Sequence, residues 1–375
     1  SIYFARQDMK QKMFSEELNI KSTTPGRYKW LFGAFGFWQG IDNTVTLDYF
    51  TKDYATRKLY DTPAYGVAFY HQSTIDDLLT RGLSLTFGIR YDYEHTSNDF
   101  LFYKETDGGS EQMDAFDSRL KFSQVTPKIA LQYMFPSTGM LYATVTKGYK
   151  TGGFNTSFDR EEDRTFRPET SWNYEFGAKH PFLDNRLNAE FCFFWIDWKN
   201  QQIYQMLATQ NGQFLRNAGR SESKGVEVSL QGNPVNGLMV QVNYGFTHAT
   251  FKDYKERRGI DYSGNFLPMV PRHTFAVGAD YTIPNPCRHI DRFTVSANYT
   301  GTGRILWKED NKVSQPYYGL LNAKVSATKD FITFAIWAKN MTGADYSAFY
   351  FETGGKGLAQ KGRPFTIGGN IQLSF

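Results

Sequence analysis

The sequence predicts an all-β protein, a transmembrane antiparallel β-barrel, from three observations. Apolar and polar residues alternate in many segments of about ten residues, the length that a tilted strand needs to cross a bilayer. Short connections rich in turn residues alternate with long ones, as in outer-membrane barrels. Aromatic residues make up 17% of the 375 residues. Many of them lie near the ends of the alternating segments, where interfacial girdles are expected.

The C-terminal segment FTIGGNIQLSF shows the alternation clearly. Phe365, Ile367 and Ile371 fall on one side of a strand, and Thr366 and Asn370 fall on the other, because successive side chains of a strand point to opposite faces. Such a strand has one apolar face and one polar face. We expect it to separate hydrocarbon from water.

The same alternation recurs upstream. In LSLTFGIRYDYE, for example, Leu85, Phe87 and Ile89 oppose Thr86 and Arg90. About fifteen such segments are present, each long enough to cross a bilayer. They are 10–22, 28–38, 62–72, 83–95, 123–134, 140–149, 170–181, 186–199, 220–231, 237–251, 272–283, 291–303, 317–328, 331–340 and 363–375.

The connections between these segments fall into two classes. If the short ones face the periplasm, the last segment runs toward the periplasm and Phe375 lies at the periplasmic rim. The short connections are 22–27, 135–139, 181–186, 232–237 and 328–331, with 73–82 and 284–291 of intermediate length on the short side. The long ones are 39–61, 96–121, 150–169, 200–219, 252–271, 304–316 and 341–361.

Composition excludes several other classes of protein. No apolar run approaches the length of a helical membrane span, and a mean hydropathy of -0.51 fits a barrel because polar residues alternate with apolar ones. A net charge of +4 is too small to indicate nucleic-acid binding. The two cysteines and six histidines show no disulfide, zinc or HExxH spacing. With no GxSxG or Walker pattern either, we expect no enzyme, no cofactor and no metal site.

Two questions stay open at this stage. A soluble propeller or sandwich also alternates, but no repeat of about 40 residues with blade signatures is present. The chain opens SIYFARQDMK without a signal peptide, so either a leader was cleaved or the front of the protein is missing. An odd strand number also differs from the even number of bacterial barrels, which indicates an absent N-terminal piece or a miscount by one.

Ten motifs, in order along the chain, resemble the C-terminal part of the barrel of TonB-dependent outer-membrane receptors, in particular the iron-complex and siderophore branch. They include LYATVTKGYKTGGFN (141–155), FRPETSWNYEFGAK (166–179), NAGRSESKGVEVSL (217–230) and GRPFTIGGNIQLSF (362–375). The resemblance implies a barrel of about 22 strands filled by a plug domain. Residues 1–375 would form the C-terminal portion of the barrel, and the plug is not present in this chain.

The resemblance also implies a function and a set of partners. It implies a ligand-gated active transporter of the bacterial outer membrane that contacts the TonB complex through the plug and takes up a ferric siderophore. Haem, cobalamin or a glycan are the alternative cargoes, and a passive porin or an adhesin are the alternative functions. Outer-membrane lipid, lipopolysaccharide and a lipoprotein lid are the other partners considered.

The long loops hold the candidate binding residues. Ferric chelates are often aromatic and anionic, so aromatic rings could stack on them and cationic side chains could pair with them. The alternative is that these side chains only pack the loops together. Glu175 and Lys179 are expected in a polar network inside the barrel, and Phe375 is expected as a membrane-interface residue. The ligand-binding candidates are Tyr149, Lys150, Phe154, Arg160, Arg164, Tyr204, Phe214, Tyr346, Phe349 and Tyr350.

Overall fold

The computed structural model describes residues 3–158, 160–206, 213–217, 219–256, 259–353 and 356–375. The chain forms two compact units. The first contains residues 1–79, 84–129 and 146–169, and the second contains 80–83, 130–145 and 170–375. Across the described residues, no helix combines the length and apolar character that a membrane span requires.

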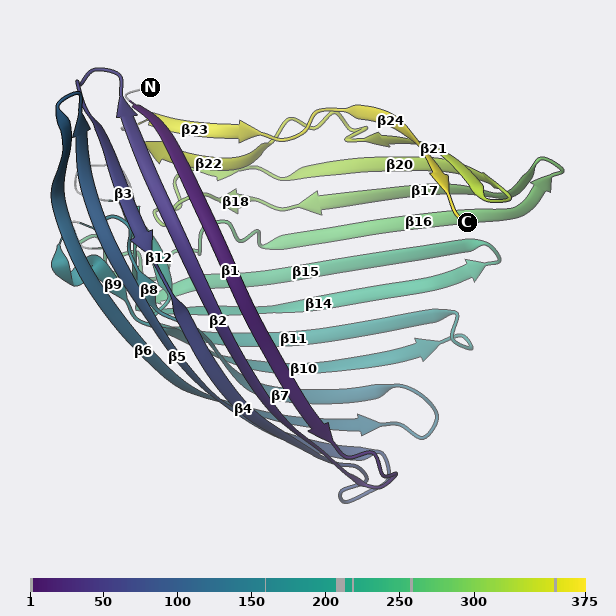
Figure 1. The fold of residues 1–375 in the computed structure, drawn as a ribbon. Helices are drawn as coiled ribbons and strands as arrows, with labels where there is room; N and C mark the ends of the chain where they lie inside the picture. The colour runs from purple at the N-terminus through teal and green to yellow at the C-terminus, as the bar shows by residue number, and fades with distance from the viewer. Residues whose placement is uncertain (1–2, 159, 207–212, 218, 257–258, 354–355) are drawn as a thin grey trace. The chain divides into compact units, whose positions relative to one another are not determined.

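A 16-stranded sheet dominates the described part of the chain, and its paired strands are antiparallel. In the first unit, β2 pairs with β1 along one edge and with both β4 and β3 along the other, and β5 also pairs with β4 and β3 (Figure 1). The strands that lie mainly in this unit are β1 (Tyr3–Lys21), β2 (Tyr28–Tyr49), β3 (Ala55–Asp61), β4 (Ala64–Ile75), β5 (Leu83–Thr106) and β6 (Gly109–Met134).

In the second unit, each main strand from β10 onward pairs with the next in sequence order, so that β14, β15, β16 and β17 lie side by side in Figure 1. The strand β7 (Met140–Lys150) contributes residues to both units. The main strands of the second unit are β10 (Glu169–Phe182), β11 (Leu187–Lys199), β14 (Arg220–Val235), β15 (Leu238–Asp253), β16 (His273–Cys287), β17 (Ile290–Thr302), β20 (Tyr318–Lys329), β21 (Ile332–Lys339) and β24 (Thr366–Leu373).

Each of the fifteen predicted segments corresponds to a strand of this sheet. Two of the predicted long loops are wrong. Residues 39–61 contain the end of β2 and the additional strand β3, and residues 96–121 are almost entirely strand because β5 runs to Thr106 and β6 starts at Gly109. The alternating pattern missed these extensions because both of their faces are polar in places. Asp42, Asp61 and Asp99 share one cross-strand row, for example.

The main sheet has an apolar face and a polar face. On β24, Ile367 and Ile371 are 64% and 69% exposed, and Ile371 lies directly opposite Phe334 of β21. Exposed apolar side chains at alternate positions continue this apolar face, as with Val67 and Phe69 on β4. The alternation predicted for the C-terminal segment is therefore confirmed, with its apolar side chains on the surface rather than in a protein core.

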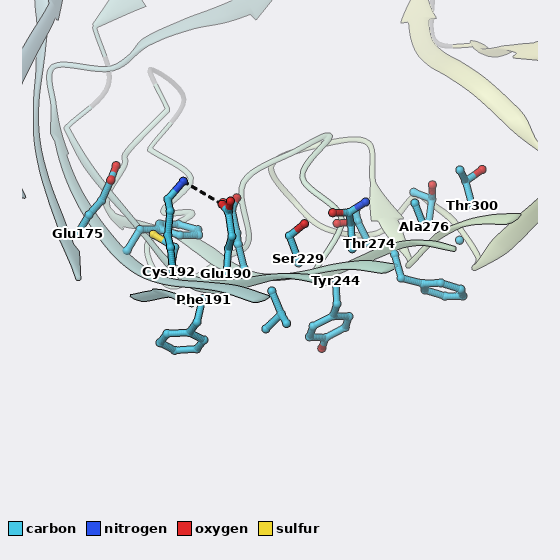
Figure 2. Close-up of a pocket in the computed structure, with 18 of the residues that line it drawn as sticks. Glu175, Glu190, Phe191, Cys192, Ser229, Tyr244, Thr274, Ala276 and Thr300 are labelled. Carbon is cyan, nitrogen blue, oxygen red and sulfur yellow. Dashed lines mark hydrogen bonds and ion pairs between the residues drawn. The ribbon is translucent and has the colours of Figure 1, made fainter. Parts of the chain in front are cut away.

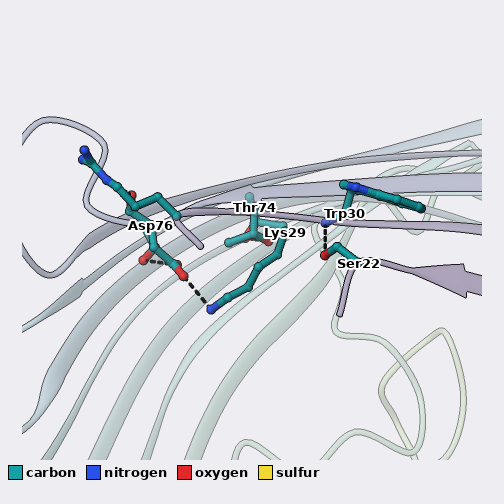
Figure 3. Close-up of polar contacts among 8 residues, drawn as sticks. Ser22, Lys29, Trp30, Thr74 and Asp76 are labelled. Carbon is teal, nitrogen blue, oxygen red and sulfur yellow. Dashed lines mark hydrogen bonds and ion pairs between the residues drawn. The ribbon is translucent and has the colours of Figure 1, made fainter. Parts of the chain in front are cut away.

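One end of the sheet carries short turns, and polar contacts join two of them. The Asp76 carboxylate accepts hydrogen bonds from Lys29 Nζ at 2.5 Å and from Ser84 Oγ at 2.8 Å (Figure 3). The backbone N–H of Trp30 donates to Ser22 Oγ at 3.0 Å. Lys29 lowers the pKa of Asp76 below its ordinary value, and Ser84 adds to this effect. We call this end of the sheet the short-turn end and the opposite end the long-loop end.

The connections at the long-loop end contain small hairpins of their own. Each hairpin is a separate two-stranded antiparallel sheet. They pair β8 (Gly153–Phe154) with β9 (Thr165–Phe166), β12 (Gln202–Met206) with β13 (Gln213–Asn217), β18 (Ile305–Leu306) with β19 (Ser314–Gln315), and β22 (Ser347–Thr353) with β23 (Lys356–Lys361).

Candidate functional site

Loop 150–169 of the first unit is held in shape by its own side chains. A 3-10 helix, Glu161–Arg164, lies between β8 and β9. Asn155 is buried and closes the loop, because its backbone N–H donates to Arg164 O at 2.8 Å and its side-chain amide donates to Asp163 O at 2.7 Å. A loop closed in this way presents a defined surface rather than a disordered one.

Arg164 lies at the centre of an aromatic cluster in the first unit. Its guanidinium is 3.9 Å from the ring centroid of Phe116 and 5.6 Å from that of Phe158, and it pairs with Glu161 at 3.2 Å. Phe116 in turn stacks on Phe100 at 4.6 Å. Stacking and pairing on this scale fix a guanidinium in place. Arg164 therefore supports the loop from within.

The other predicted residues of the first unit lie nearer the surface. Tyr149 is half-buried near the end of β7, and Lys150, the last residue of β7, is exposed. Phe154 is half-buried on β8. Arg160 is exposed, and its guanidinium pairs with Glu162 at 3.3 Å. Lys150, Arg160 and Arg167 are the exposed cations of this loop.

In the second unit, the two candidates on hairpin β12–β13 have opposite environments. Tyr204 is 61% exposed, whereas Phe214 is 1% exposed. Between them, the buried Gln205 donates from Nε2 to Tyr254 Oη at 3.3 Å. Tyr204 is thus available to a ligand, and Phe214 packs inside the loop assembly.

The hairpin belongs to a packed assembly of outer loops. Its core consists of Ala249, Phe251, Tyr254 and Leu267, and Ile203 of β12 packs against it. Phe251 also donates its backbone N–H to Asn265 O at 2.9 Å. The sequence analysis missed this core, because its members come from the end of β15 and from the following loop, without any periodic pattern.

One asparagine joins loop 304–316 to loop 252–271. Asn311 Oδ1 accepts the backbone N–H of Phe266 at 2.8 Å, and Asn311 Nδ2 donates to Phe266 O at 2.9 Å. The side-chain amide of Asn311 thus bonds to the backbone N–H and C=O of Phe266, as the backbone of a neighbouring strand would. Asn311 has a φ of 57°, a conformation that asparagine tolerates better than most residues. Its turn-forming character is visible in the sequence, but its partner is not.

Of the remaining candidates, Phe349 and Tyr350 lie on hairpin β22–β23 and Tyr346 directly precedes it. Tyr346 stacks on Tyr318 at a centroid distance of 4.2 Å. Phe349 is 41% exposed. Tyr350 donates from Oη to Glu352 Oε1 at 2.9 Å, and Glu352 Oε2 pairs with Lys308 Nζ at 2.6 Å. The Phe349 ring stacks on Phe351 at a centroid distance of 6.0 Å but stays more exposed to a ligand than a buried ring would be.

One carboxyl in this loop assembly is partly buried. Its desolvation raises the pKa of Glu309; a backbone hydrogen bond and Lys308 oppose this effect, and the nearby carboxylates of Glu256 and Asp310 add to it. Burial also raises the pKa of Tyr254 above its ordinary value and that of Tyr262 to about 12. Sequence reasoning did not single out Glu309, because its burial depends on loops distant in the chain.

The polar face of the second unit contains a hollow of about 740 Å³. Figure 2 shows Glu190, Ser229 and Thr274 on one side of the sheet, with Phe191 and Tyr244 on the opposite side. The three carboxylates of the hollow belong to Glu175, Glu190 and Glu227.

Glu175 and Lys179, for which a polar network is predicted, both line this hollow and have polar partners there. Lys179 Nζ pairs with Glu190 at 2.9 Å, and Asn173 Nδ2 donates to Glu175 at 2.5 Å. Of the three carboxylates, only that of Glu190 has a lysine partner among the described contacts of the hollow. The hollow is therefore a negatively charged surface.

Within the described residues, no group of three or more His, Cys, Asp or Glu side chains could hold a metal ion.

The last predicted residue, Phe375, lies on the surface beside another aromatic ring. Phe375 is fully exposed and stacks on Phe331 at 5.6 Å, at the short-turn end.

Comparison with known proteins agrees with this geometry. The family model described as TonB dependent receptor-like, beta-barrel, matches residues 3–341. Fold and match together define the class of protein, a non-enzymatic β-barrel of the bacterial outer membrane. The chain belongs to the TonB-dependent receptor family.

Individual relatives are distant. The pesticin receptor of Yersinia pestis is 24% identical over 378 residues, which cover 98% of this chain and 53% of that protein. The ferric-pyoverdine M114 receptor PbuA of Pseudomonas sp. (strain M114) is 24% identical over 217 residues, 57% of this chain and 24% of that protein. The chain spans about half the length of the pesticin receptors that it matches.

Solved structures show the same fold. The ferric yersiniabactin uptake receptor FyuA from Yersinia pestis superimposes with a TM-score of 0.85 at 20% identity, covering 100% of this chain and 56% of that one. The closed form of the ferric-catecholate import receptor Fiu from E. coli K12 gives 0.69 at 19% identity, covering 98% and 55%.

Proposed function

We propose that the chain forms barrel strands of an energy-coupled receptor that takes up a ferric siderophore. Family membership supports an outer-membrane receptor, and several relatives are named for ferric siderophores. In this proposal a plug domain and the TonB complex supply gating. The carboxylates of Glu175 and Glu227 on the polar face would receive basic side chains of the plug.

The observation that carries the proposal is the exposure of two rings in the long loops of the second unit. Tyr204 and Phe349 are 61% and 41% exposed. In the first unit, loop 150–169 separately exposes the cations Lys150 and Arg160. Rings of this kind can stack on an aromatic chelator, and the cations can offset its negative charge. This chain's own residues would bind and orient the cargo before any gating movement.

Uptake of radioactive iron tests the proposal in cells that carry the full-length receptor as their only siderophore receptor. We expect saturable uptake of a ferric siderophore that stops when TonB is deleted. Uptake that continues without TonB would establish the passive porin instead. Uptake of haem or cobalamin, with no ferric siderophore transported, would overturn the proposed cargo.

The binding surface is tested by a matched pair of tyrosines. Tyr204→Ala should weaken binding of the transported siderophore by about tenfold, the effect of losing roughly 1.4 kcal/mol of stacking. Tyr281→Ala is the control, because Tyr281 is 44% exposed but lies on β16 in the main sheet. Equal affinities for the two variants would remove Tyr204 from the site.

A further inference from the structure

The apolar face of the first unit contains a second hollow, of about 470 Å³, across β1, β2, β4 and β5. Its volume lies within the usual range of small-ligand pockets, about 300–1,000 Å³. Cross-strand register explains the hollow. Ala34 of β2 lies directly between Leu18 of β1 and Phe69 of β4. A single methyl group between two large, exposed side chains leaves a depression in the face.

The hollow has a polar end. The next cross-strand row toward the short turns contains Phe32 and His71, whose rings lie 4.1 Å apart between centroids. His71 Nε2 shares a hydrogen bond of 2.8 Å with Ser73 Oγ, which shares another of 2.9 Å with Tyr28 Oη. Two hydroxyls and an imidazole thus stand together at this end of the hollow.

The polar end of the hollow is open to a ligand. Tyr28 is 52% exposed, and its hydroxyl ends the chain of hydrogen bonds that runs through Ser73 to His71. A ligand that brings a hydrogen-bonding group to this end, and an apolar chain to the rest of the hollow, would match both surfaces.

We propose that the hollow binds one glycerophospholipid of the periplasmic leaflet. One acyl chain lies over Ala34 between Leu18 and Phe69. The ester and head group meet His71, Ser73 and Tyr28. The hollow is continuous with the apolar face that the membrane covers in this family, so a lipid reaches it without leaving the bilayer.

The orientation of the hollow selects the leaflet. Its polar end points toward the short turns, which face the periplasm in outer-membrane barrels. Phospholipids of the periplasmic leaflet place their head groups at that depth. Lipopolysaccharide places its head group at the opposite membrane surface, so its polar part would lie far from His71, Ser73 and Tyr28.

The test measures lipid retained by the full-length receptor after extraction and extensive washing in mild detergent, by native mass spectrometry. Ala34→Phe fills the hollow, and His71→Leu removes the polar anchor while leaving the space open. Ala189→Phe is the matched control. Like Ala34, Ala189 lies between two larger side chains in a cross-strand row, here His180 and Leu230, but it is away from the hollow. Heat-dependent mobility on gels confirms that each variant is folded.

We expect about one phospholipid per barrel in the wild type and in Ala189→Phe, and about tenfold less in Ala34→Phe and His71→Leu. A wild type without retained phospholipid would overturn the proposal, as would undiminished retention in Ala34→Phe or retention of lipopolysaccharide in place of phospholipid. The inference rests on membership of the outer-membrane family and not on the proposed cargo. A negative result would leave siderophore uptake unaffected.

Discussion

At the scale of single residues, Asn311 illustrates how one side chain organises the long-loop end. Its amide forms two hydrogen bonds with the backbone of Phe266 and a third, from Nδ2, to Lys308 O at 3.1 Å. Backbone groups in a loop require partners of this kind wherever water is excluded. Docking of loop 304–316 therefore depends strongly on this position.

Replacing Asn311 with glycine should release the loop. Glycine accepts the φ of 57° but has no side chain that could form the hydrogen bonds to Phe266. We expect the Phe266 amide to exchange hydrogen about tenfold faster, as measured by exchange mass spectrometry. Lys312→Gly, one residue away and exposed, is the control and should change little. Unaltered exchange in Asn311→Gly would show that other contacts hold the loop.

Glu309 should make loop docking depend on pH. Its folded-state pKa is raised by burial, whereas a free glutamate has a pKa of about 4.3. Below that pH Glu309 is protonated in both the docked and the undocked loop, so docking does not require burial of a charge. As pH rises toward the folded-state pKa, the unfolded loop releases its proton more readily, so docking weakens by about 1.4 kcal/mol per unit of pKa difference until it levels off.

The variant Glu309→Gln removes this titration. We expect it to slow amide exchange in loop 304–316 relative to wild type at neutral pH, and to match wild type near pH 4. Dividing the exchange rate of the variant by that of wild type at each pH removes the intrinsic pH dependence of amide exchange, which is the same in both proteins. Glu162→Gln, in a different loop, is the control. A ratio that stays constant between pH 4 and 8 would contradict the expected effect of burial.

At the scale of elements, hairpin β12–β13 carries one side chain that packs in the loop core and one that faces solvent. Phe214 is 1% exposed and Tyr204 is 61% exposed. Removing a buried phenylalanine ring costs about 3–5 kcal/mol. We expect Phe214→Ala to increase proteolytic cleavage of the loop strongly, and Tyr204→Ala to leave cleavage unchanged. Similar cleavage of both variants would show that Phe214 does not anchor the hairpin.

The elements also show what sequence can predict. Strands with one face in hydrocarbon, such as β24, follow from alternation alone because water and lipid select opposite side chains. β3 does not, because Thr56, Lys58 and Tyr60 face one side while Arg57 and Asp61 face the other, so polar residues occur on both. The loop core around Phe251 depends on contacts between distant segments, which no local pattern encodes.

The sequence predicts only part of the candidate site, because exposure also depends on contacts between distant segments. Residue type identified rings and cations in the long loops, and Tyr204 and Phe349 are exposed there. Residue type does not reveal exposure, so Phe214 and Arg164 were grouped with them although both are engaged in packing. Their role as ligand contacts remains a prediction that binding measurements must test.

At the scale of the whole molecule, two isoleucines with equal exposed fractions should differ in how well they tolerate a charge, because one faces lipid and the other faces water. Ile336 of β21 is 49% exposed and Ile260 of an outer loop is 48% exposed. Ile336→Arg should cost up to about 2–4 kcal/mol, depending on depth in the bilayer, whereas Ile260→Arg should cost almost nothing. Urea titration of the full-length barrel in lipid vesicles measures both. Equal stability of the two variants would place Ile336 outside the hydrocarbon.

The two sides of hairpin β12–β13 also bear on how such receptors diverge. If Tyr204 contacts the chelator as proposed, an inherited change there leaves the scaffold folded, so mutation can sample new chelators one step at a time. A change at Phe214 has to be accompanied by compensating changes in the loops around it. Preference for cargo can therefore drift between lineages faster than the framework that presents it.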